Sequence, residues 1–345
     1  MEKENQLLVQ IFSFILVVFF AFLIGAILIL LIGNNPIIGY YALFEGAFGS
    51  LYSFSETLVR ATPILLATIG IIIPFKCKCI NLGVEGQIYM GAIAAALASF
   101  NFQSYYGLHI TLIALSSFLA GAFWAFFPGF LKAKFGINEI LIGLMMNFIA
   151  IYFASYIVGG PLKDPNAIFH RTPIIPSTAQ LPKIIPGTRL HAGFFIAIFC
   201  SILIYIILSK TTLGYKFKAV GSGQECALYG GIKVQNIIIL SMVLGGGFAG
   251  LAGLGEVCGV HRYLLENISP GYGYLAFAVA LLGKLNPLAS IFASILFAAL
   301  MVGAESMQRT TGIPVVLIYV IEGLVILSAL CGGLSIRRKW RFLYA

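Results

Sequence analysis

The longest polar interruption in the second half of this chain runs from Lys210 to Val234 and carries four lysines against a single glutamate. Within it, Ser222 and Glu225 have the spacing of a capping box, in which the serine hydroxyl accepts a backbone N–H and the glutamate reaches back. The Gly230–Gly231 pair supplies a helix stop, because glycine adopts the left-handed conformation at little cost. The spacing predicts a short helix over Gly223–Tyr229. A helix of that length is marginal alone in water, so we expect it to dock against a partner.

A second set of candidates consists of polar side chains inside or beside apolar runs. They are Arg60, Asn81, Glu85, Gln87, Glu139 and Asn147. Polar groups at membrane depth are expensive unless they face water or a partner, so these residues are candidates for a path that a solute follows. Each also has a structural role open to it. Glu85 and Gln87 suit the amino end of a helix, Asn147 can bond a neighbouring helix, and Arg60 stands four residues after Glu56, where the two can pair.

The sequence contains no motif for hydrolysing a nucleotide or holding a metal. A GxxxxGK[ST] phosphate loop is absent, and the run Gly221–Cys226 breaks the dinucleotide pattern at its last position. The six cysteines are scattered, and the pair at Cys77 and Cys79 lacks the second ligand pair of a zinc site. We therefore expect no catalytic residue, no metal and no cofactor. If the chain moves a solute against a gradient, the energy must come from ions or from a partner.

The composition indicates which elements position these residues. Of 345 residues, 60% are hydrophobic and 10% charged, and the mean hydropathy is +1.00, whereas soluble domains are about 45–50% apolar and about 25% charged. This predicts an all-α, multi-pass transmembrane bundle. A single domain over residues 1–345, with about ten spans of about 20 residues each, uses the whole chain. The net charge of +9 lies in short clusters between apolar runs, so we expect no nucleic acid partner.

The apolar runs predict where the spans lie. We expect spans at residues 7–32, 54–74, 88–100, 110–127, 139–159, 192–208, 236–257, 274–282, 288–304 and 315–330. A loop around Glu45 should join the first two spans, and Pro128 should mark a turn after the fourth. The segment Leu162–Leu190 has five prolines and no helical period, which predicts an ordered extracytoplasmic loop. Gly246 and Gly250 are small residues four apart and predict close packing of two helices.

The positive charges predict the orientation of the bundle. About two thirds of the 21 lysines and arginines fall in turns that the predicted spans place on one side, including the cluster Arg337–Arg341. Because cytoplasmic loops carry an excess of lysine and arginine, we expect both termini and the Lys210–Val234 stretch in the cytoplasm. The protein itself should lie in the cytoplasmic membrane.

Several short runs spread over most of the chain carry a family resemblance. They are Thr211–Gly214, Ala219–Gly221, Ala227–Ile232, Asn81–Gln87, Asn138–Glu139 with Leu144–Asn147, and Gly271–Gly273 with Ala280–Pro287. Together they resemble the permease subunits of ATP-binding-cassette importers, in the branch that carries nucleosides and simple sugars. The resemblance extends from about Tyr40 to Leu334, and Asn81–Gln87 is its most specific part. The chain departs from the family pattern at Ser222–Gly223, where Asn-Pro or Asn-Glu is usual, and at Lys284, where arginine is common.

The resemblance implies a function and a set of partners. Residues 210–234 would form the cytoplasmic coupling loop that docks on a separate ATPase subunit. The contacts would come from Gly221, Ser222, Gln224, Glu225, Ala227, Tyr229 and Gly230. A second permease subunit, identical or different, would complete the path, and an extracytoplasmic binding protein or lipoprotein would dock on residues 162–190 and 261–273.

The implied cargo is a nucleoside or a similar small polar solute. Simple sugars such as ribose, and vitamins such as riboflavin, are alternatives, because similar permeases carry them. Two other classes remain open at this point. An ion-coupled secondary transporter would show paired acids in broken helices and inverted repeats, and a non-transporting membrane scaffold would not need a capped inner helix.

Overall fold

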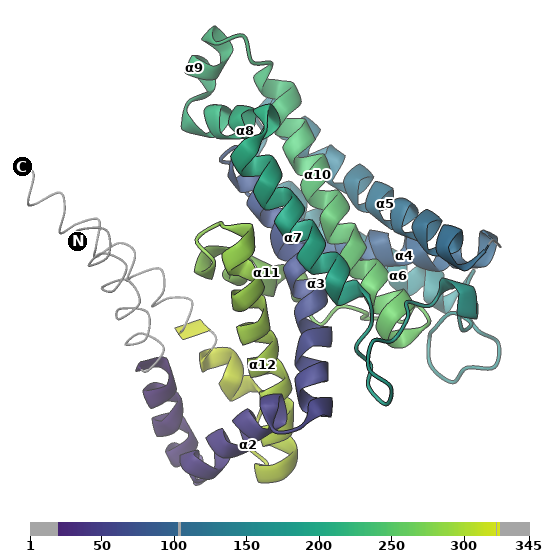
Figure 1. The fold of residues 1–345 in the computed structure, drawn as a ribbon, viewed down its shortest axis with the longest axis vertical. Helices are drawn as coiled ribbons and strands as arrows, with labels where there is room; N and C mark the ends of the chain where they lie inside the picture. The colour runs from purple at the N-terminus through teal and green to yellow at the C-terminus, as the bar shows by residue number, and fades with distance from the viewer. Residues whose placement is uncertain (1–19, 103–104, 322, 325–345) are drawn as a thin grey trace, which may run out of the picture. The chain divides into compact units, whose positions relative to one another are not determined.

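The computed structural model describes residues 20–102, 105–321 and 323–324, and these residues form helices joined by loops (Figure 1). No strand occurs in this described part, only two isolated antiparallel bridges. The all-α prediction is therefore confirmed. Six helices of the described part are long and apolar enough to cross a membrane: α3, α5, α6, α7, α10 with its extension, and α12. The total of about ten spans remains a prediction, and both termini, with Arg337–Arg341, lie outside the described residues.

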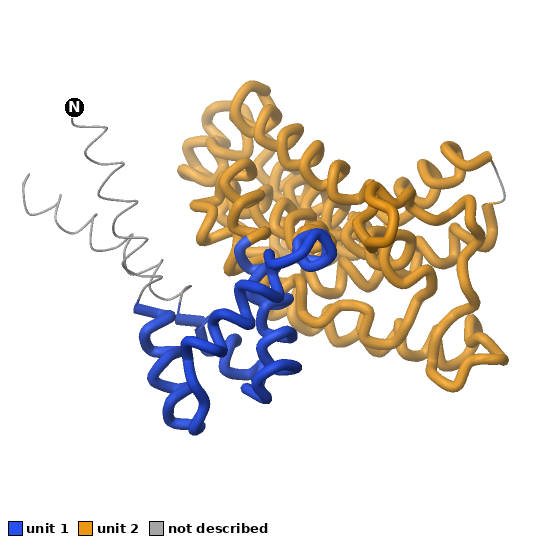
Figure 2. The backbone as a smooth tube through the Cα atoms, turned by 60° about the horizontal axis from the view of Figure 1, so that its bottom comes forward, with its two compact units in different colours: residues 1–57, 296–345 blue, residues 58–295 orange. Residues whose placement is uncertain are grey.

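The chain divides into two compact units (Figure 2). Unit 1 combines residues 1–57 with residues 296–345, and unit 2 is the continuous stretch 58–295. Helices α3 (Leu51–Phe75) and α12 (Pro287–Thr311) each begin in one unit and end in the other. All of the candidate residues proposed from the sequence belong to unit 2.

Unit 1 contains a helix that the sequence did not predict, α2 (Pro36–Phe48), beside the helix Phe20–Leu31 and the second half of α12. The prediction of a loop around Glu45 is therefore wrong. Asn35 begins α2, because its side chain accepts from the Ile37 N–H at 2.9 Å and Pro36 occupies the first turn. Glu45 lies on the exposed face of the helix. The opposite face packs into a core that includes Ile29, Leu43, Leu300, Met307 and Ile318.

Unit 2 contains α4 (Val84–Asn101), α5 (Tyr106–Phe135), α6 (Glu139–Gly159), α7 (Gly193–Lys210), α10 (Val234–Leu254) and α11 (Tyr272–Leu282). These helices agree with the predicted spans except at Pro128. Pro128 lies inside α5, which continues for two more turns to Gly136, where φ is +69° and the helix ends. A proline removes one backbone bond but is tolerated within a long apolar helix that neighbouring helices support, so the glycine is the stronger stop signal here.

Helix α10 packs against α4 and α5 through glycines. A Cβ on Gly250 would lie 2.3 Å from the Ser117 carbonyl oxygen, and one on Gly91 would lie 2.2 Å from the Gly250 carbonyl oxygen. A Cβ on Gly246 would lie 2.5 Å from the Gly121 carbonyl oxygen. These backbones approach so closely that a methyl group does not fit between them. The close packing predicted from Gly246 and Gly250 is confirmed.

Beyond α10 the chain continues as a π-helix over Gly255–His261, which the sequence did not predict. The Leu162–Leu190 loop rests on this segment. The Leu181 N–H donates to the Cys258 carbonyl at 2.9 Å, and the Ile175 N–H donates to the Arg262 carbonyl at 2.9 Å. The loop contains only one short 3₁₀ turn, Ser177–Ala179. The segment, which is described in full, contains no helix long enough to span a membrane, and its extracytoplasmic location remains a prediction.

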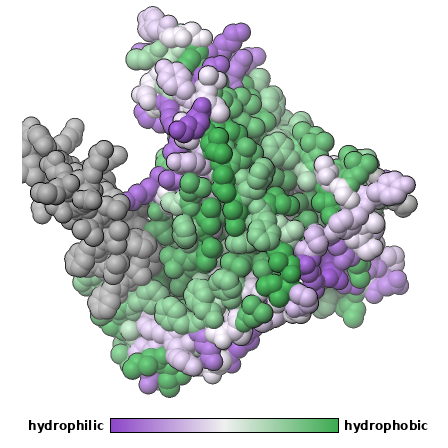
Figure 3. Space-filling view, viewed as in Figure 1, coloured by the Kyte–Doolittle hydropathy of each residue, from purple (hydrophilic) through white to green (hydrophobic). Residues whose placement is uncertain are grey.

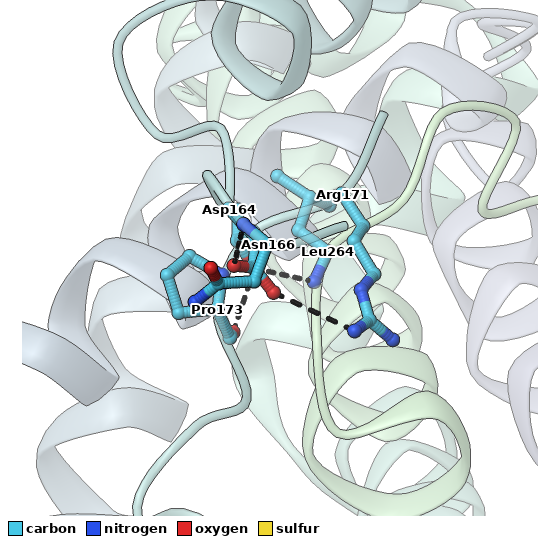
Figure 4. A network of polar contacts seen from close by, with 6 residues as sticks. Asp164, Asn166, Arg171, Pro173 and Leu264 are labelled. Carbon is cyan, nitrogen blue, oxygen red and sulfur yellow. Dashed lines mark hydrogen bonds and ion pairs between the residues drawn. The ribbon is translucent and has the colours of Figure 1, made fainter. Parts of the chain in front are cut away.

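A polar network fixes the first half of the same loop (Figure 4). The Asp164 carboxylate accepts from the Arg171 guanidinium at 3.5 Å and from the Asn166 N–H at 3.0 Å. The Leu264 N–H donates to the Thr172 hydroxyl at 3.0 Å, and the Thr172 N–H donates back to the Leu264 carbonyl at 2.9 Å. Residues nearly 100 positions apart are thereby joined through their backbones.

Candidate functional site

Asn81 and Gln87 form a buried pair at the start of α4. The Asn81 amide donates to the Gln87 side-chain oxygen at 3.0 Å, and the Gln87 amide donates to the Asn81 oxygen at 3.0 Å. Asn81 also donates to the Gly70 carbonyl of α3 at 3.2 Å and accepts from the Gly83 N–H at 3.2 Å. Both side chains are buried, and such groups are stable inside a bundle because they are hydrogen-bonded.

Asn147 and Glu85 extend this pair to two further helices. The Asn147 oxygen accepts from the Gly86 N–H at 2.8 Å, and its amide donates to the Leu82 carbonyl at 2.8 Å. The Glu85 carboxylate accepts from the Gly273 N–H, in the first turn of α11, at 2.7 Å. We call Asn81, Glu85, Gln87 and Asn147 the buried amide cluster. The cluster joins the α3–α4 loop and the start of α4 to α3, α6 and α11.

Glu139 holds the same α3–α4 loop from the first turn of α6. One carboxylate oxygen accepts from the Ile80 N–H at 3.2 Å, and the other pairs with the Lys132 ammonium of α5 at 2.9 Å. The glutamate is buried, whereas the Lys132 side chain is 29% exposed. A carboxylate is favoured in the first turn of a helix, where unpaired N–H groups carry partial positive charge. Glu139 is therefore a junction between α5, α6 and the loop.

Arg60 lies apart from the other predicted path residues. It stands ten residues before Gly70 on α3, which corresponds to about 15 Å along the helix. The structure thus brings five of the six residues to one end of α3 and leaves Arg60 towards the other. Most of the polar atoms of these five bond to backbone groups, which supports their structural roles. Their contact with a solute remains a prediction.

The polar stretch 210–234 contains two helices, α8 (Thr212–Ser222) and α9 (Gln224–Tyr229). The predicted short helix over Gly223–Tyr229 is confirmed as α9, with Gly231 in the left-handed conformation at its end (φ +77°). The predicted capping box is wrong. The Ser222 hydroxyl donates to the Lys218 carbonyl at 2.8 Å and belongs to α8, and no side chain caps α9.

The sequence did not predict α8, because its lysines and other polar residues obscure the helical spacing of its apolar residues. Thr211 begins the helix by accepting from the Gly214 N–H at 3.3 Å, while Phe217, Val220 and Gly221 are buried. Lys216 and Lys218 are exposed on the other side of the helix. The serine that ends α8 uses its hydroxyl within that helix, so it is not available to cap α9.

Helix α9 presents most of its side chains to solvent. Gln224, Glu225 and Tyr229 are exposed, as are Ser222 and Gly230 on either side of the helix. Ala227 is buried, and so is Gly221 of α8, which packs against the turn after α3. Hydrophilic residues predominate on the surface over α8 and α9, above the hydrophobic face of α7 (Figure 3). The predicted coupling residues therefore divide into an exposed set on α9 and two buried anchors, Gly221 and Ala227.

A groove of about 730 Å³ lies beside α9, between the end of α5 and the start of α10. Its lining includes Lys132, Gln224, Glu225, Leu228 and Lys233. Among the described residues, no group of three or more His, Cys, Asp and Glu side chains is placed to hold a metal ion. The groove thus combines charged side chains with apolar ones at this end of unit 2.

Residues 53–334 match the family model described as the permease component of branched-chain amino acid transport systems. The chain belongs to this permease family. Its multiple apolar helices and this membership make it a multi-pass membrane protein and a transport component, as the motif resemblance implied.

Three curated relatives are each 32% identical to the chain. A glucose ABC transporter permease of Haloferax volcanii aligns over 91% of this chain and 85% of its own length. A guanosine ABC transporter permease of Bacillus subtilis aligns over 94% and 93%, and a nucleoside ABC transporter permease of Lactococcus lactis over 94% and 91%. None of the solved structures gives a significant match. The permease of an ABC importer is the class to which the chain belongs.

Three residues that complete the site were not among the candidates. Lys132 pairs with Glu139, the Gly273 N–H binds Glu85, and the Tyr274 hydroxyl lies 3.3 Å from the Asn147 amide. Lys132 of α5 precedes Glu139 of α6 by seven residues, with a turn between them. Because the two lie on different helices, their spacing in the sequence does not predict that they pair. The Gly271–Gly273 run was noted in the sequence, but a backbone donor has no side-chain signature.

Proposed function

We propose that the chain forms the translocation path of an importer for a nucleoside or a similar small polar solute. The guanosine and nucleoside permeases, each aligned over 94% of the chain, support this cargo. The structural observation that supports the coupling most is α9, a short helix with exposed Gln224, Glu225 and Tyr229 that is anchored through buried Ala227. In this proposal a separate ATPase supplies the energy, and an extracytoplasmic binding protein or lipoprotein delivers the solute.

In the proposed transport cycle, the ATPase shifts the equilibrium between two conformations of the helical bundle. Closure of the ATPase dimer would displace α9, and the bundle would change the side to which it opens. The binding protein would dock on residues 162–190 and 261–273, and a second permease subunit would complete the path. We further propose about ten spans with both termini in the cytoplasm, which puts α8 and α9 on the ATPase side.

A simple sugar is the second candidate cargo. The glucose permease of Haloferax volcanii has the same 32% identity as the two nucleoside-type relatives. The buried amide cluster does not discriminate between the two cargoes, because both are rich in hydroxyl groups. The cargo must therefore be decided by measurement.

The decisive experiment is uptake into liposomes that contain this chain, its second permease, its ATPase and its binding protein. We expect ATP-dependent uptake of labelled guanosine, with labelled glucose and riboflavin as competing solutes. Reversal of charge at exposed Glu225 (Glu225→Arg) should reduce both uptake and copurification of the ATPase. Glu45→Arg, the same charge reversal at an exposed residue of α2 outside the stretch 210–234, is the matched control. Uptake that persists without the ATPase would contradict the proposal.

A further inference from the structure

Helix α8 rests directly on the turn that follows α3. A Cβ on Gly221 would lie 2.0 Å from the Lys76 carbonyl oxygen and 3.4 Å from the Cys77 Cα. The first distance is far inside van der Waals contact, and the obstacle is a backbone atom, so no rotamer change relieves it. Only glycine fits at this position while α8 stays in place.

The same face of α8 is buried around Gly221. Phe217 and Val220 are almost fully buried on the helix, and Cys77 is fully buried on the turn. Burial lowers the pKa of Lys76, and the charge of Lys218 on α8 lowers it further. The close approach at Gly221 and these buried side chains pack α8 against the turn, although the charges of Lys76 and Lys218 repel each other.

The segment that leaves this turn is fixed at successive residues up to α4. The Ile80 N–H donates to Glu139, Asn81 bonds to Gln87 and to the Gly70 carbonyl, and the Leu82 carbonyl accepts from Asn147. At Gly83, the neighbouring α6 comes so close that a Cβ on Gly143 would lie 2.8 Å from the Gly83 nitrogen. A displacement of the turn at Lys76 is therefore carried to the buried amide cluster.

On its other side, α8 is tied to α9 through a single residue. Gly223 lies between the two helices, and its N–H donates to the Ala219 carbonyl of α8 at 3.2 Å. Its carbonyl accepts from the Ala227 N–H of α9 at 3.0 Å. Because Gly223 bonds to both helices, α9 cannot shift far without taking the end of α8 with it.

Building on the proposed function, we propose that the contact between Gly221 and Lys76 transmits the movement of α8 and α9 to the buried amide cluster. Gly221 is thus a positioning residue for transport, and it is separate from the exposed side chains of α9 that meet the ATPase. The route runs from α9 through α8 and the Lys76–Gly83 segment to Asn81, Gln87 and Asn147. It ends at α11 through Glu85.

The test is Gly221→Ala in the complete transporter in liposomes. We expect the ATPase to copurify as in the wild type and to continue hydrolysing ATP, while uptake per ATP falls about tenfold or more, within the usual range of coupling between sites. Gly107→Ala is the matched control, because it makes the same change at a glycine with no other atom within 4 Å of the added Cβ. Unchanged uptake per ATP in Gly221→Ala would overturn the inference. So would a loss of ATPase binding in proportion to uptake, because Gly221 would then act in docking.

A second variant decides the question if Gly221→Ala does not fold. Gln87→Met breaks the amide pair at the far end of the route and leaves Gly221 in place. We expect it, too, to lower uptake per ATP without loss of the ATPase. Where Gly221→Ala does fold, the double variant should have the same uptake per ATP as the single variant with the lower value. Undiminished uptake per ATP in Gln87→Met, or losses that multiply in the double variant, would overturn the route. Absence of ATP-driven uptake in the wild type would instead overturn the proposed function itself.

Discussion

The side-chain amides of Asn81 and Gln87 face one another and exchange two hydrogen bonds, each 3.0 Å long, in the buried interior of unit 2. Asn81 belongs to the loop after α3, and Gln87 belongs to the first turns of α4. The pair therefore fixes how one helix enters the next. Asn81 also bonds to Gly70 and Gly83, so loss of Gln87 leaves one N–H of the Asn81 amide without an acceptor.

Replacing Gln87 by methionine should destabilise the protein while keeping its side-chain volume. The Asn81 amide would lose both of its bonds to Gln87 and keep those to Gly70 and Gly83, and the buried N–H left unpaired costs about 1–3 kcal/mol. Chemical denaturation of the purified protein in detergent measures this change. Asn101→Ala is the control, since Asn101 makes one exposed bond to Leu97 and should change stability by less than about 0.5 kcal/mol. Equal stabilities of the two variants would contradict the amide pair.

Adding a methyl group to Gly250 should force α10 away from α5. The Cβ would lie 2.3 Å from the Ser117 carbonyl oxygen, so the helices must separate or bend. Overpacking of this kind costs about 1–3 kcal/mol. We expect Gly250→Ala to lower the midpoint of thermal unfolding, whereas Gly107→Ala, which meets nothing within 4 Å, should not. A Gly250→Ala protein as heat-stable as the wild type would show that α10 and α5 do not meet at this residue.

Glu139 and Lys132 should contribute unequally although they form one ion pair. Glu139→Ala leaves both the Ile80 N–H and Lys132 without the carboxylate, in a buried position. Lys132→Ala leaves the buried Glu139 carboxylate with only the Ile80 N–H as a partner, whereas the lysine that Glu139→Ala leaves behind is 29% exposed and can turn to solvent. We expect Lys132→Ala to cost about 3–5 kcal/mol, as for a buried charge without its partner, and Glu139→Ala about 1–3 kcal/mol, mainly for the unpaired Ile80 N–H. Equal losses in denaturation experiments would argue that the ion pair alone matters.

The sequence was sufficient to predict the elements with strong local signals. The apolar runs predict the spans, and Gly230 and Gly231 predict the end of α9. It was misleading where one residue suits two local structures. Ser222 fits both a capping box and the last turn of α8, and the choice depends on the burial of Phe217 and Val220 against other segments. Pro128 is a helix breaker in general, yet the apolar surroundings of α5 tolerate it.

The partners of the candidate residues could not be predicted, because they come from distant parts of the chain. Asn81 and Gln87 are near each other in the sequence, and their polar side chains make them recognisable candidates. Asn147, in contrast, accepts a hydrogen bond from the N–H of Gly86, which lies more than 60 residues earlier in the chain. The π-helix depends in the same way on tertiary contacts. The Cys258 carbonyl in its centre accepts the N–H of Leu181 from the Leu162–Leu190 loop, and no local pattern encodes that bond.

Cys226 should report directly on docking of the ATPase. It is the one exposed cysteine among those that the structure describes, on the exposed side of α9, whereas Cys77, Cys79, Cys200 and Cys258 are buried. In a Cys331→Ser background, a maleimide should label Cys226 alone in the isolated permease, and the assembled transporter should be protected. The Cys226→Ser variant gives the background rate. Equal labelling with and without the ATPase would contradict docking through α9.

The pH dependence of stability should contain a contribution from His191. Burial lowers the pKa of its imidazole from 6.5 to about 4, and its Nδ1 accepts from the Gly193 N–H at 3.1 Å, which requires that nitrogen to be unprotonated. The unfolded chain takes up this proton below pH 6.5, whereas the folded chain takes it up only near pH 4. The free energy of unfolding is therefore unaffected above pH 6.5 and falls between these values, by about 3 kcal/mol in total.

His191→Asn separates this contribution from the other titrating groups. The asparagine oxygen can still accept from the Gly193 N–H, but the side chain does not titrate in this range. Denaturation midpoints measured from pH 7 to pH 4 should fall less steeply in the variant than in the wild type, with the difference appearing only below about pH 6.5. Parallel curves for the two proteins would mean that burial and the Gly193 N–H do not hold the imidazole neutral in the folded protein.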